Sequence, residues 1–302
     1  MIALSTSWLP ESGWPIDVAL DRLMSFGCTQ LEFNYRVHPL DLDATRRALA
    51  ERGLSVTSLH NICSADEAPV PFEDRYGDSL GDLDEDRRAA GAAHLRHTAE
   101  AARALGARAV VIHGGLVPPF EDSRVYHKAL RQTERQNDPS FVKALLTHMV
   151  PERNQVAPAC LAQLIRSLKA VCPAFPDLKF GLEIRYHFYG LPDFDELATV
   201  LAEVEAPNVG YWHDCGHGQM QENLGLRRAE EWLQRYQDRL IGLHLHGVID
   251  TVQDHEAPAK GNMDFELIRR YTRPDTLRVM ELSPSNSPEV VLAGKAYLET
   301  LF

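Results

Sequence analysis

Histidines and carboxylates gather where short apolar runs of the sequence end. Several imidazoles and carboxylates buried in one place are costly unless a cation compensates them. Histidine together with Asp or Glu suits Zn, Mn, Co or Fe. The pattern therefore predicts a site for one or more divalent metal ions, and with it an enzyme. The run ends in question are Leu59-His60, Ile112-His113, Leu182-Glu183, Trp212-His213-Asp214, Leu243-His244-Leu245-His246 and Met280-Glu281.

Four of these residues form the strongest candidate ligand set. Glu183, Asp214, His246 and Glu281 end four different runs, whereas a lone strand-end Glu or His is often only an ion-paired or packed group. Side chains alternate along a strand, so His244 shares the inward face with His246 and is expected to support a ligand. By the same alternation, His213 is expected to point away from Asp214 and to be structural.

One order of elements recurs along the chain: a β-rich apolar run, a polar or Gly/Pro loop, then a helical pattern. Eight such units in 302 residues predict an α/β fold, a closed (β/α)8 TIM barrel that forms a single domain over 1–302. The expected strands are Ile2–Ser7, Gln30–Tyr35, Leu54–His60, Ala107–His113, Leu178–Ile184, Asn208–Asp214, Leu240–His246 and Leu277–Leu282. The expected helices are 16–26, 41–52, 85–105, 122–136, 193–204, 226–238, 264–271 and 288–300.

Two stretches exceed what a bare barrel needs. Residues 61–84 form a long acidic loop after the third strand, and residues 114–177 follow the fourth. The second stretch is expected to hold an extra helix near Pro158–Val171 and a loop over the barrel mouth. Both follow strands, which is the catalytic side of this architecture.

Charge and cysteine content narrow the class of protein. The formal net charge of −12 argues against nucleic acid as a partner and leaves a small-molecule substrate. The five cysteines are odd in number and form no CxxC pair, which predicts reduced thiols in a cytoplasmic protein. No signal peptide and no apolar run long enough to span a membrane is evident.

Taken together, these residues and their order resemble the xylose isomerase-like barrel superfamily, over most of the chain. That superfamily contains sugar isomerases, ketose 3-epimerases and the endonuclease IV type of phosphodiesterase. The resemblance implies that Glu183, Asp214, His246 and Glu281 hold the metal. It rests also on the DxxH motif Asp214-Cys215-Gly216-His217 and on the loop from Asp254-His255 to Gly261.

The endonuclease-like branch implies further ligands, which His60, His113, His217 and His255 match. Two departures count against a complete three-metal cluster in this chain. Gln253 stands where that branch has an Asp, so that the acidic residue here is Asp254, and Gly247 stands where many relatives have an Asp.

The resemblance leaves three functions open. The favoured one is a sugar, sugar phosphate or sugar acid isomerase or epimerase of carbohydrate metabolism, working through an enediolate. Glu183 and Glu281 would then be the acid and base. His217 and Arg185 would hold hydroxyls or a phosphate, and His60 and His113 the far end of the sugar. The alternatives are a multinuclear phosphodiesterase on a small phosphodiester or nucleic acid, and a non-catalytic metal- or ligand-binding barrel. Barrels of this kind often pair, so a homo-oligomer is expected.

Overall fold

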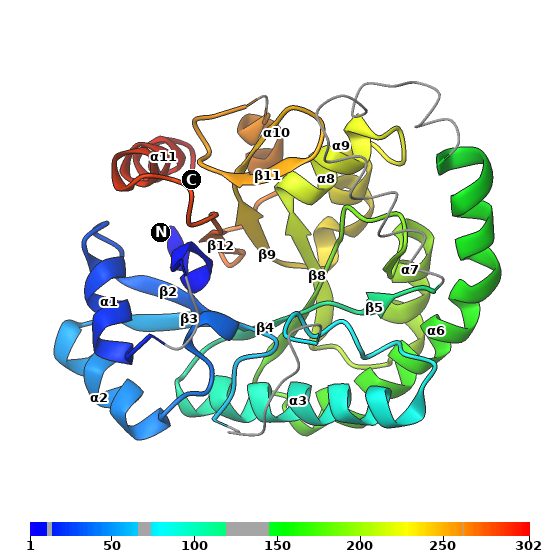
Figure 1. The fold of residues 1–302 in the computed structure, drawn as a ribbon, viewed down its shortest axis with the longest axis horizontal. Coiled ribbons are helices and arrows are strands. Elements are labelled where there is room, and N and C mark those ends of the chain that lie inside the picture. Colours follow the sequence, from blue (N-terminus) through cyan, green and yellow to red (C-terminus); the bar gives the residue numbers. More distant parts are fainter. Residues whose placement is uncertain (11–13, 66–73, 119–144, 262) are drawn as a thin grey trace.

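The computed structural model describes residues 1–10, 14–65, 74–118, 145–261 and 263–302 (Figure 1). Its centre is a closed barrel of eight parallel strands, joined in the order β1-β12-β9-β8-β6-β4-β3-β2. Each barrel strand falls on one strand expected from the sequence, which confirms the (β/α)8 TIM barrel. The strands are β1 (Ala3–Ser5), β2 (Gln30–Phe33), β3 (Ser55–His60), β4 (Ala109–Ile112), β6 (Lys179–Glu183), β8 (Val209–Asp214), β9 (Leu240–Leu245) and β12 (Leu277–Met280).

Helices surround the barrel, as Figure 1 shows. Most of those expected are present, and α8 directly after Asp214 is an addition that the sequence pattern did not predict. The helices are α1 (Ile16–Met24), α2 (Leu42–Arg52), α3 (Glu85–Ala104), α6 (Val150–Val171), α7 (Phe194–Glu203), α8 (Cys215–Asn223), α9 (Ala229–Tyr236), α10 (Phe265–Arg270) and α11 (Pro288–Leu301). Short helical turns are η1 (Thr6–Trp8), η2 (Tyr35–Val37), η3 (Leu145–Met149), η4 (Cys172–Ala174) and η5 (Gln237–Arg239).

One long helix lies between β4 and β6 in the described part of the chain. The helix expected near Pro158–Val171 is present as part of the longer α6, which packs between α3 and α7 in the ring around the barrel. The helix predicted at 122–136 lies outside the described residues.

The acidic run before α3 begins that helix, as its composition suggests. Asp84 is the N-cap, and its carboxylate accepts hydrogen bonds from the backbone N–H groups of Asp86 and Arg87 at 3.0 Å. Glu85 and Asp86 occupy the first turn. Negative charge is favourable at this end of a helix.

Trp212 of β8 fills the barrel interior beneath the mouth. It is fully buried, and two glycines on the neighbouring strands leave it room. A Cβ atom at Gly181 would lie 2.9 Å from the indole, and one at Gly242 would lie 2.3 Å from it. The indole ring also meets His244 edge-on, with ring centroids 5.2 Å apart. The barrel interior directly below the site is therefore tightly packed around Trp212.

Two small antiparallel sheets lie outside the barrel. One pairs β5 (Gly115–Leu116) with β7 (Gly190–Leu191). The other pairs β10 (Gly247–Ile249), which follows β9, with β11 (Gln253–Glu256). Because Asp254 and His255 lie on β11, this hairpin determines where their side chains go.

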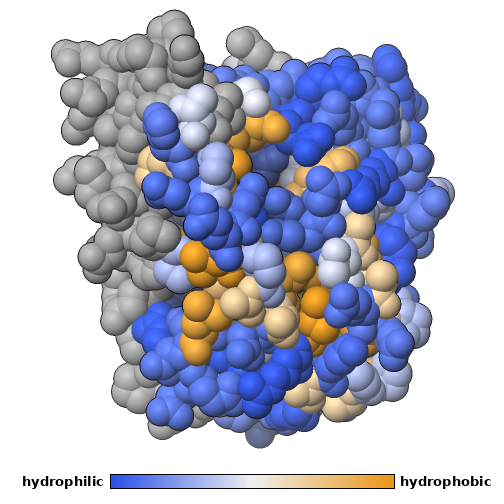
Figure 2. All heavy atoms as spheres, turned by 90° about the vertical axis from the view of Figure 1, so that its right-hand side faces the viewer, coloured by the Kyte–Doolittle hydropathy of each residue, from blue (hydrophilic) through white to orange (hydrophobic). Residues whose placement is uncertain are grey.

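The remaining expectations concern the surface and the thiols. Figure 2 shows one side of the molecule as largely hydrophilic, with hydrophobic side chains gathered near its middle. Among the described residues, no helix has the length and apolar content needed to cross a bilayer. All five cysteines are free and buried, which agrees with the expectation of reduced thiols.

Candidate active site

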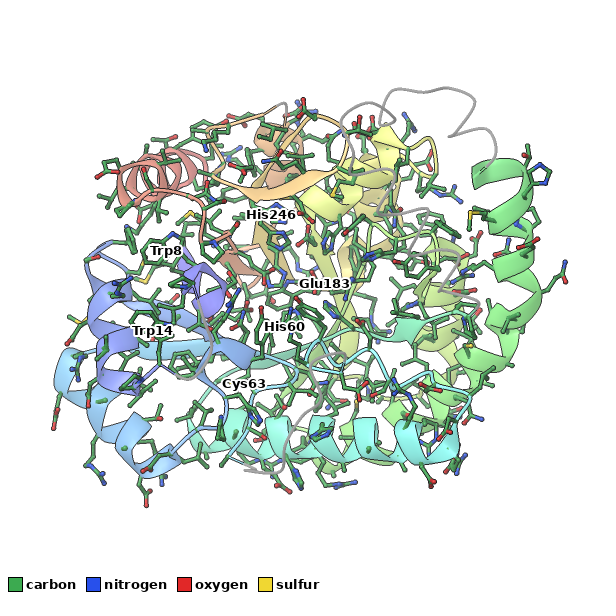
Figure 3. All side chains as sticks on the ribbon, viewed as in Figure 1. Trp8, Trp14, His60, Cys63, Glu183 and His246 are labelled. Carbon is green, nitrogen blue, oxygen red and sulfur yellow. The ribbon has the colours of Figure 1, made fainter. Side chains whose placement is uncertain are left out.

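The predicted site residues converge at one end of the barrel. Figure 3 shows His60, Glu183 and His246 lying near the barrel centre, whereas Trp8 and Trp14 lie toward α1. Each of the first three stands at or just after the carboxyl end of a barrel strand. Carboxyl ends of parallel strands meet at the same rim of a barrel, which is why segments so far apart in sequence build one site.

A first group of donor atoms comprises Glu183, Asp214, His244 and Glu281, all within 4.8 Å of one another. Nδ1 of His244 lies 3.1 Å from Glu183 and 2.9 Å from Glu281. All four side chains are buried, and their mixture of carboxylates and imidazole suits a divalent metal ion. Three of the four match the expected ligand set.

The fourth expected ligand, His246, lies beside this group and not in it. Its Nε2 is 2.9 Å from one oxygen of Asp214 and 3.0 Å from the other. Its Nδ1 accepts a hydrogen bond from the backbone N–H of His255. The reason is the strand register, because β8 and β9 place His244 directly opposite Asp214. His244 therefore lies within this group, whereas His246 reaches it through Asp214.

A second group comprises His60, His113 and Glu183. Nε2 of His60 lies 3.0 Å from Oε2 of Glu183, and Nε2 of His113 lies 2.8 Å from the same oxygen. Behind His113, Asp78 forms an ion pair with Arg185 at 3.1 Å, and Arg185 contacts Nδ1 of His113. Asp78 was missed at the sequence level because it is one acidic residue among many in the loop after β3.

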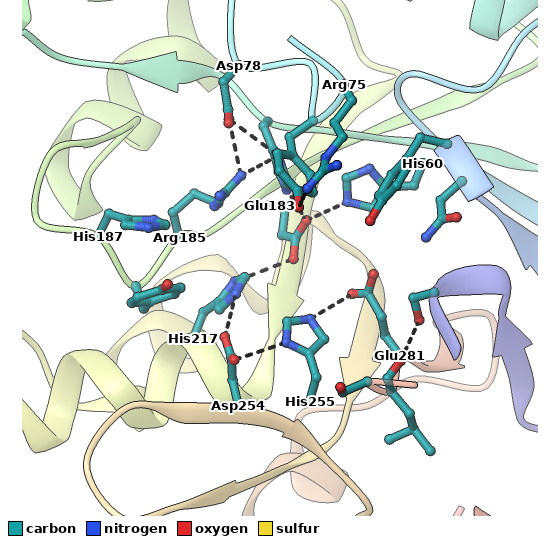
Figure 4. Close-up of a pocket in the computed structure, with 18 of the residues that line it drawn as sticks. His60, Arg75, Asp78, Glu183, Arg185, His187, His217, Asp254, His255 and Glu281 are labelled. Atoms are coloured by element: carbon teal, nitrogen blue, oxygen red, sulfur yellow. Dashed lines mark hydrogen bonds and ion pairs between the residues drawn. The ribbon is translucent and has the colours of Figure 1, made fainter. Parts of the chain in front are cut away.

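A third group comprises Asp214, His217 and His255, with Asp254 close by. Nδ1 of His217 donates to the Ile184 carbonyl at 2.8 Å, which leaves Nε2 directed toward Asp254 at 3.7 Å. Nδ1 of His255 lies 3.2 Å from Asp254. Figure 4 shows these contacts as a chain that continues from His255 to Glu281. The DxxH motif and the loop histidine therefore meet in space.

The backbone at His255 adopts the left-handed region, with φ of 58°. A non-glycine residue in this region costs roughly 1–2 kcal/mol. Its carbonyl is held by two donors, the Asn286 side chain at 2.9 Å and the Ser283 backbone N–H at 2.8 Å. Such a conformation persists where surrounding contacts hold it, and it occurs preferentially at functional sites.

Neighbouring opposite charges shift the pKa values of the buried carboxylates and of His244. Burial acts to raise the pKa of Glu183, but His244 and His113 outweigh it and hold the pKa well below its usual range. Burial likewise opposes ionisation of Glu281, and His244 again holds the pKa far below normal. Burial acts to lower the pKa of His244, but Glu281 and Glu32 raise it well above the usual value. The carboxylates are therefore anions that need a cation beside them, either imidazolium or metal.

Glu32 lies behind His244. Its carboxylate lies 3.1 Å from Nε2 of His244 and accepts a hydrogen bond from the Ser58 hydroxyl at 2.7 Å. Glu32 is fully buried and does not line the pocket, and it contacts the first group through His244.

The groups border one pocket of about 780 Å³, which lies within the range of about 300–1,000 Å³ typical of small-molecule sites. Of the first group, Glu183 and Glu281 line the pocket, whereas Asp214 and His244 lie behind them. Tyr186 adds an aromatic wall beyond β6. Further lining residues are His60, His113, Arg185, His187, Tyr189, His217, Asp254 and His255.

His213 belongs to the packing, as expected, and so do Trp8 and Trp14. His213 is fully buried and contacts the Tyr211 hydroxyl, and burial lowers its pKa to about 4. Trp8 packs edge-on against Phe26, with ring centroids 4.8 Å apart, and its indole N–H donates to the Asn286 carbonyl. Trp14 stacks under Arg22. None of the three lines the pocket.

Residues 20–273 match the model of the family described as xylose isomerase-like TIM barrel. The chain belongs to this family. A curated relative, the uncharacterized protein y4fM of Sinorhizobium fredii (strain NBRC 101917 / NGR234), is 27% identical over 299 residues, covering 93% of this chain and 84% of that protein.

Solved structures share the fold at low sequence identity. The 3-keto-D-glucoside 4-epimerase YcjR from E. coli is 15% identical with a TM-score of 0.67, covering 99% of this chain and 98% of that one. The IOLI protein with a bound zinc atom is 12% identical with a TM-score of 0.66, covering 99% and 97%.

In this xylose isomerase-like barrel, the donor atoms of the first group show whether a metal ion fits the site. Three carboxylates converge on one imidazole nitrogen in a buried place, and His244 is in turn oriented by Glu32. A buried carboxylate cluster needs a compensating charge, and an oriented imidazole behind it is typical of metal sites. The residues present therefore fit a divalent metal ion.

Proposed function

We propose that this protein is a divalent-metal enzyme that isomerises or epimerises a small sugar, sugar phosphate or sugar acid. One observation carries the proposal: within the first metal group, the two residues that reach the pocket are both glutamates. Glu183 comes from β6 and Glu281 follows β12, so they approach the pocket from different strands. Two carboxylates flanking one space are what proton removal and proton return at a sugar carbon require.

A metal ion held by Glu183, Asp214, His244 and Glu281 would stabilise negative charge on the substrate oxygens beside the reacting carbon. Glu183 and Glu281 would exchange the proton, one taking it from the carbon next to the carbonyl and the other returning one. The low pKa of both carboxyls favours the anion, which is the form that takes the proton from carbon, and the carboxyl that returns a proton must first take one up from solvent. The deprotonated carbon and its neighbouring oxygens form the enediolate of this proposal.

The other pocket residues would orient the sugar. His60 and His113 contact Oε2 of Glu183, whereas His244 contacts Oε1, and the first two would contact hydroxyls at the far end of the substrate. Nε2 of His217 faces the pocket because Nδ1 is occupied by the Ile184 carbonyl. Tyr186 offers an aromatic surface against which a sugar ring can pack.

The test is proton exchange at carbon. Metal-loaded protein would be incubated in D2O with a panel of ketoses, sugar phosphates and sugar acids, and loss of the carbon-bound proton followed by NMR. We expect exchange in the wild type and none in Glu281→Gln, with metal content measured alongside. Wild-type protein that carries metal but exchanges no proton in any member of the panel would refute the proposal.

A second function, hydrolysis of a small phosphodiester, is favoured by a different observation. Glu183 belongs to two metal-capable groups, with Oε2 facing His60 and His113 and Oε1 facing His244. Asp214 is also shared between two groups. Carboxylates shared in this way suit two ions about 3.5–4 Å apart, an arrangement used to generate hydroxide and to neutralise phosphate.

Metal stoichiometry separates the two candidates. One ion per chain by elemental analysis, lost in Asp214→Ala and kept in His60→Ala, would support the isomerase or epimerase. Two or three ions, one of them lost in His60→Ala, together with cleavage of bis(p-nitrophenyl) phosphate, would support the hydrolase. His148→Ala, outside the pocket, is the control for the loss of a histidine.

A further inference from the structure

Two arginines line the active-site pocket beside the metal-capable groups. Arg36 lies in η2, directly after β2, and Arg75 lies in the segment between β3 and α3. Their guanidinium carbons lie over the same ring, that of Tyr35, at 5.0 and 5.1 Å from its centroid. Arg75 also lies over the ring of Tyr76 at 4.7 Å. Figure 4 shows Arg75 on the same side of the pocket as His60 and Asp78.

The position of Arg36 is fixed by its own backbone. The Asn34 side chain accepts a hydrogen bond from the Arg36 N–H at 3.0 Å and another from the Thr6 hydroxyl at 2.9 Å. At the other end of Arg36, Nη1 donates to the Pro10 carbonyl at 3.0 Å. The guanidinium group is therefore held at the pocket by contacts that do not neutralise its charge.

The charge of Arg36 contrasts with that of Arg185 in the same pocket. Arg185 forms an ion pair with Asp78. Within the described part of the chain, Arg36 has no carboxylate at ion-pair distance, and its Nε is buried without a hydrogen-bond partner. A second guanidinium on the same aromatic ring adds like charge beside it.

We propose that the substrate carries an anionic group, a phosphate or a carboxylate, which Arg36 and Arg75 bind. Guanidinium groups match both anions through paired N–H donors, and stacking on Tyr35 and Tyr76 fixes the planes of those donors. The remaining oxygens of the substrate face Glu183 and Glu281, and this second half of the assignment rests on the proposed function. Neutral sugars are thereby excluded as the preferred substrates.

The test measures anion binding without turnover. Sulfate and acetate are the probes, titrated calorimetrically into metal-loaded protein at constant ionic strength. Wild-type protein should bind at least one of them, and Arg36→Gln/Arg75→Gln should bind it at least about tenfold more weakly, as expected for loss of hydrogen bonds to a charged group. Arg270→Gln, an exposed arginine outside the pocket, should bind as the wild type does.

Each outcome decides the proposal. Tighter binding of sulfate assigns a phosphate substrate, and tighter binding of acetate assigns a sugar acid. Arg36→Lys/Arg75→Lys, which keeps the charge but not the paired donors, should fall between the wild type and the glutamine variant. Binding of neither probe, or binding that survives in the glutamine variant, overturns the proposal.

A further variant distinguishes anion binding by the arginines from anion binding by the metal ion. Binding that is lost in Asp214→Asn and kept in Arg36→Gln/Arg75→Gln would place the anion on the metal ion and would also overturn the assignment. Failure of the proposed function is distinguishable, since anion binding by the arginines would then persist while no sugar in the D2O panel exchanges its proton.

Discussion

The carboxylate of Glu32 lies 3.1 Å from Nε2 of His244, on the side of the ring away from Glu183 and Glu281. A carboxylate anion can only accept, so in a neutral His244 ring the proton belongs on Nε2. That leaves the Nδ1 lone pair directed at the three carboxylates of the first metal group. A partner of this kind fixes both the tautomer and the orientation of a metal-binding imidazole.

Replacing Glu32 should therefore weaken metal binding without removing a ligand. We expect Glu32→Gln to lower metal affinity by about 10- to 100-fold, the usual effect of losing such a partner. Competition with a chromophoric chelator measures the affinity. Glu51→Gln, the same change at an exposed position of α2, should leave it unaltered. Equal affinities for Glu32→Gln and the wild type would show that Glu32 does not orient the ligand.

The positions of His244 and His246 give a second prediction. If His244 is the metal ligand, His244→Ala should remove the ion from the first group. His246→Ala should only weaken binding, because His246 contacts the group through Asp214. Elemental analysis of both variants at equal protein concentration provides the comparison. Loss of metal in His246→Ala with retention in His244→Ala would restore the ligand set expected from the sequence.

The two histidines also show how far the sequence alone can go. Alternation along the strand correctly placed His244 and His246 on one inward face. It cannot tell which of two residues on the same face lies closer to the carboxylates. The choice depends on the register between β8 and β9, which sets His244 opposite Asp214 and includes a shift between Tyr211 and Trp212. Register is a property of two strands together, and no single run of residues contains it.

The same limit applies to loops, while the barrel itself was predictable. All eight strands follow from short apolar runs, because buried parallel strands are nearly continuous in apolar residues. Asp78 and Arg75 come from the segment after β3, where no periodicity indicates which side chains turn inward. Arg36 stands in a short helical turn whose position depends on the contacts of Asn34 with Arg36 and Thr6.

Glu281 should matter for chemistry more than for folding. Glu281→Gln keeps the volume of the side chain but removes its charge and its ability to accept a proton. We expect turnover of whichever sugar exchanges its proton in D2O to fall by about 10²- to 10⁴-fold, the usual contribution of a positioned acid or base. Circular dichroism should remain close to wild type, and thermal unfolding should too when both proteins are compared without metal. Full activity in this variant would remove Glu281 from the mechanism.

Removing the metal should lower stability. An ion that binds the folded chain alone stabilises it by about 4 kcal/mol when present at 1,000 times its dissociation constant. Chelated protein should therefore unfold at lower denaturant concentration than metal-loaded protein. In Asp214→Asn, which weakens the first group, the difference should shrink. A chelator that leaves the wild-type midpoint unchanged would argue against a metal bound by the buried carboxylates.

Packing beneath the site gives the last prediction. A Cβ atom at Gly242 would lie 2.3 Å from the Trp212 indole, whose ring meets His244 in turn. Gly242→Ala should therefore destabilise the fold by about 1–3 kcal/mol, the usual cost of overpacking a core. It should also disturb metal binding, because the indole can yield only toward its neighbours, His244 among them. Denaturant unfolding and chelator competition measure the two effects.

A double-mutant cycle identifies the contact responsible. Gly242→Ala in a Trp212→Leu background should cost less than in the wild type, because the smaller side chain leaves room for the added methyl group. An equal cost in both backgrounds would locate the strain at the backbone of β9 instead. The metal site would then be independent of the indole beneath it.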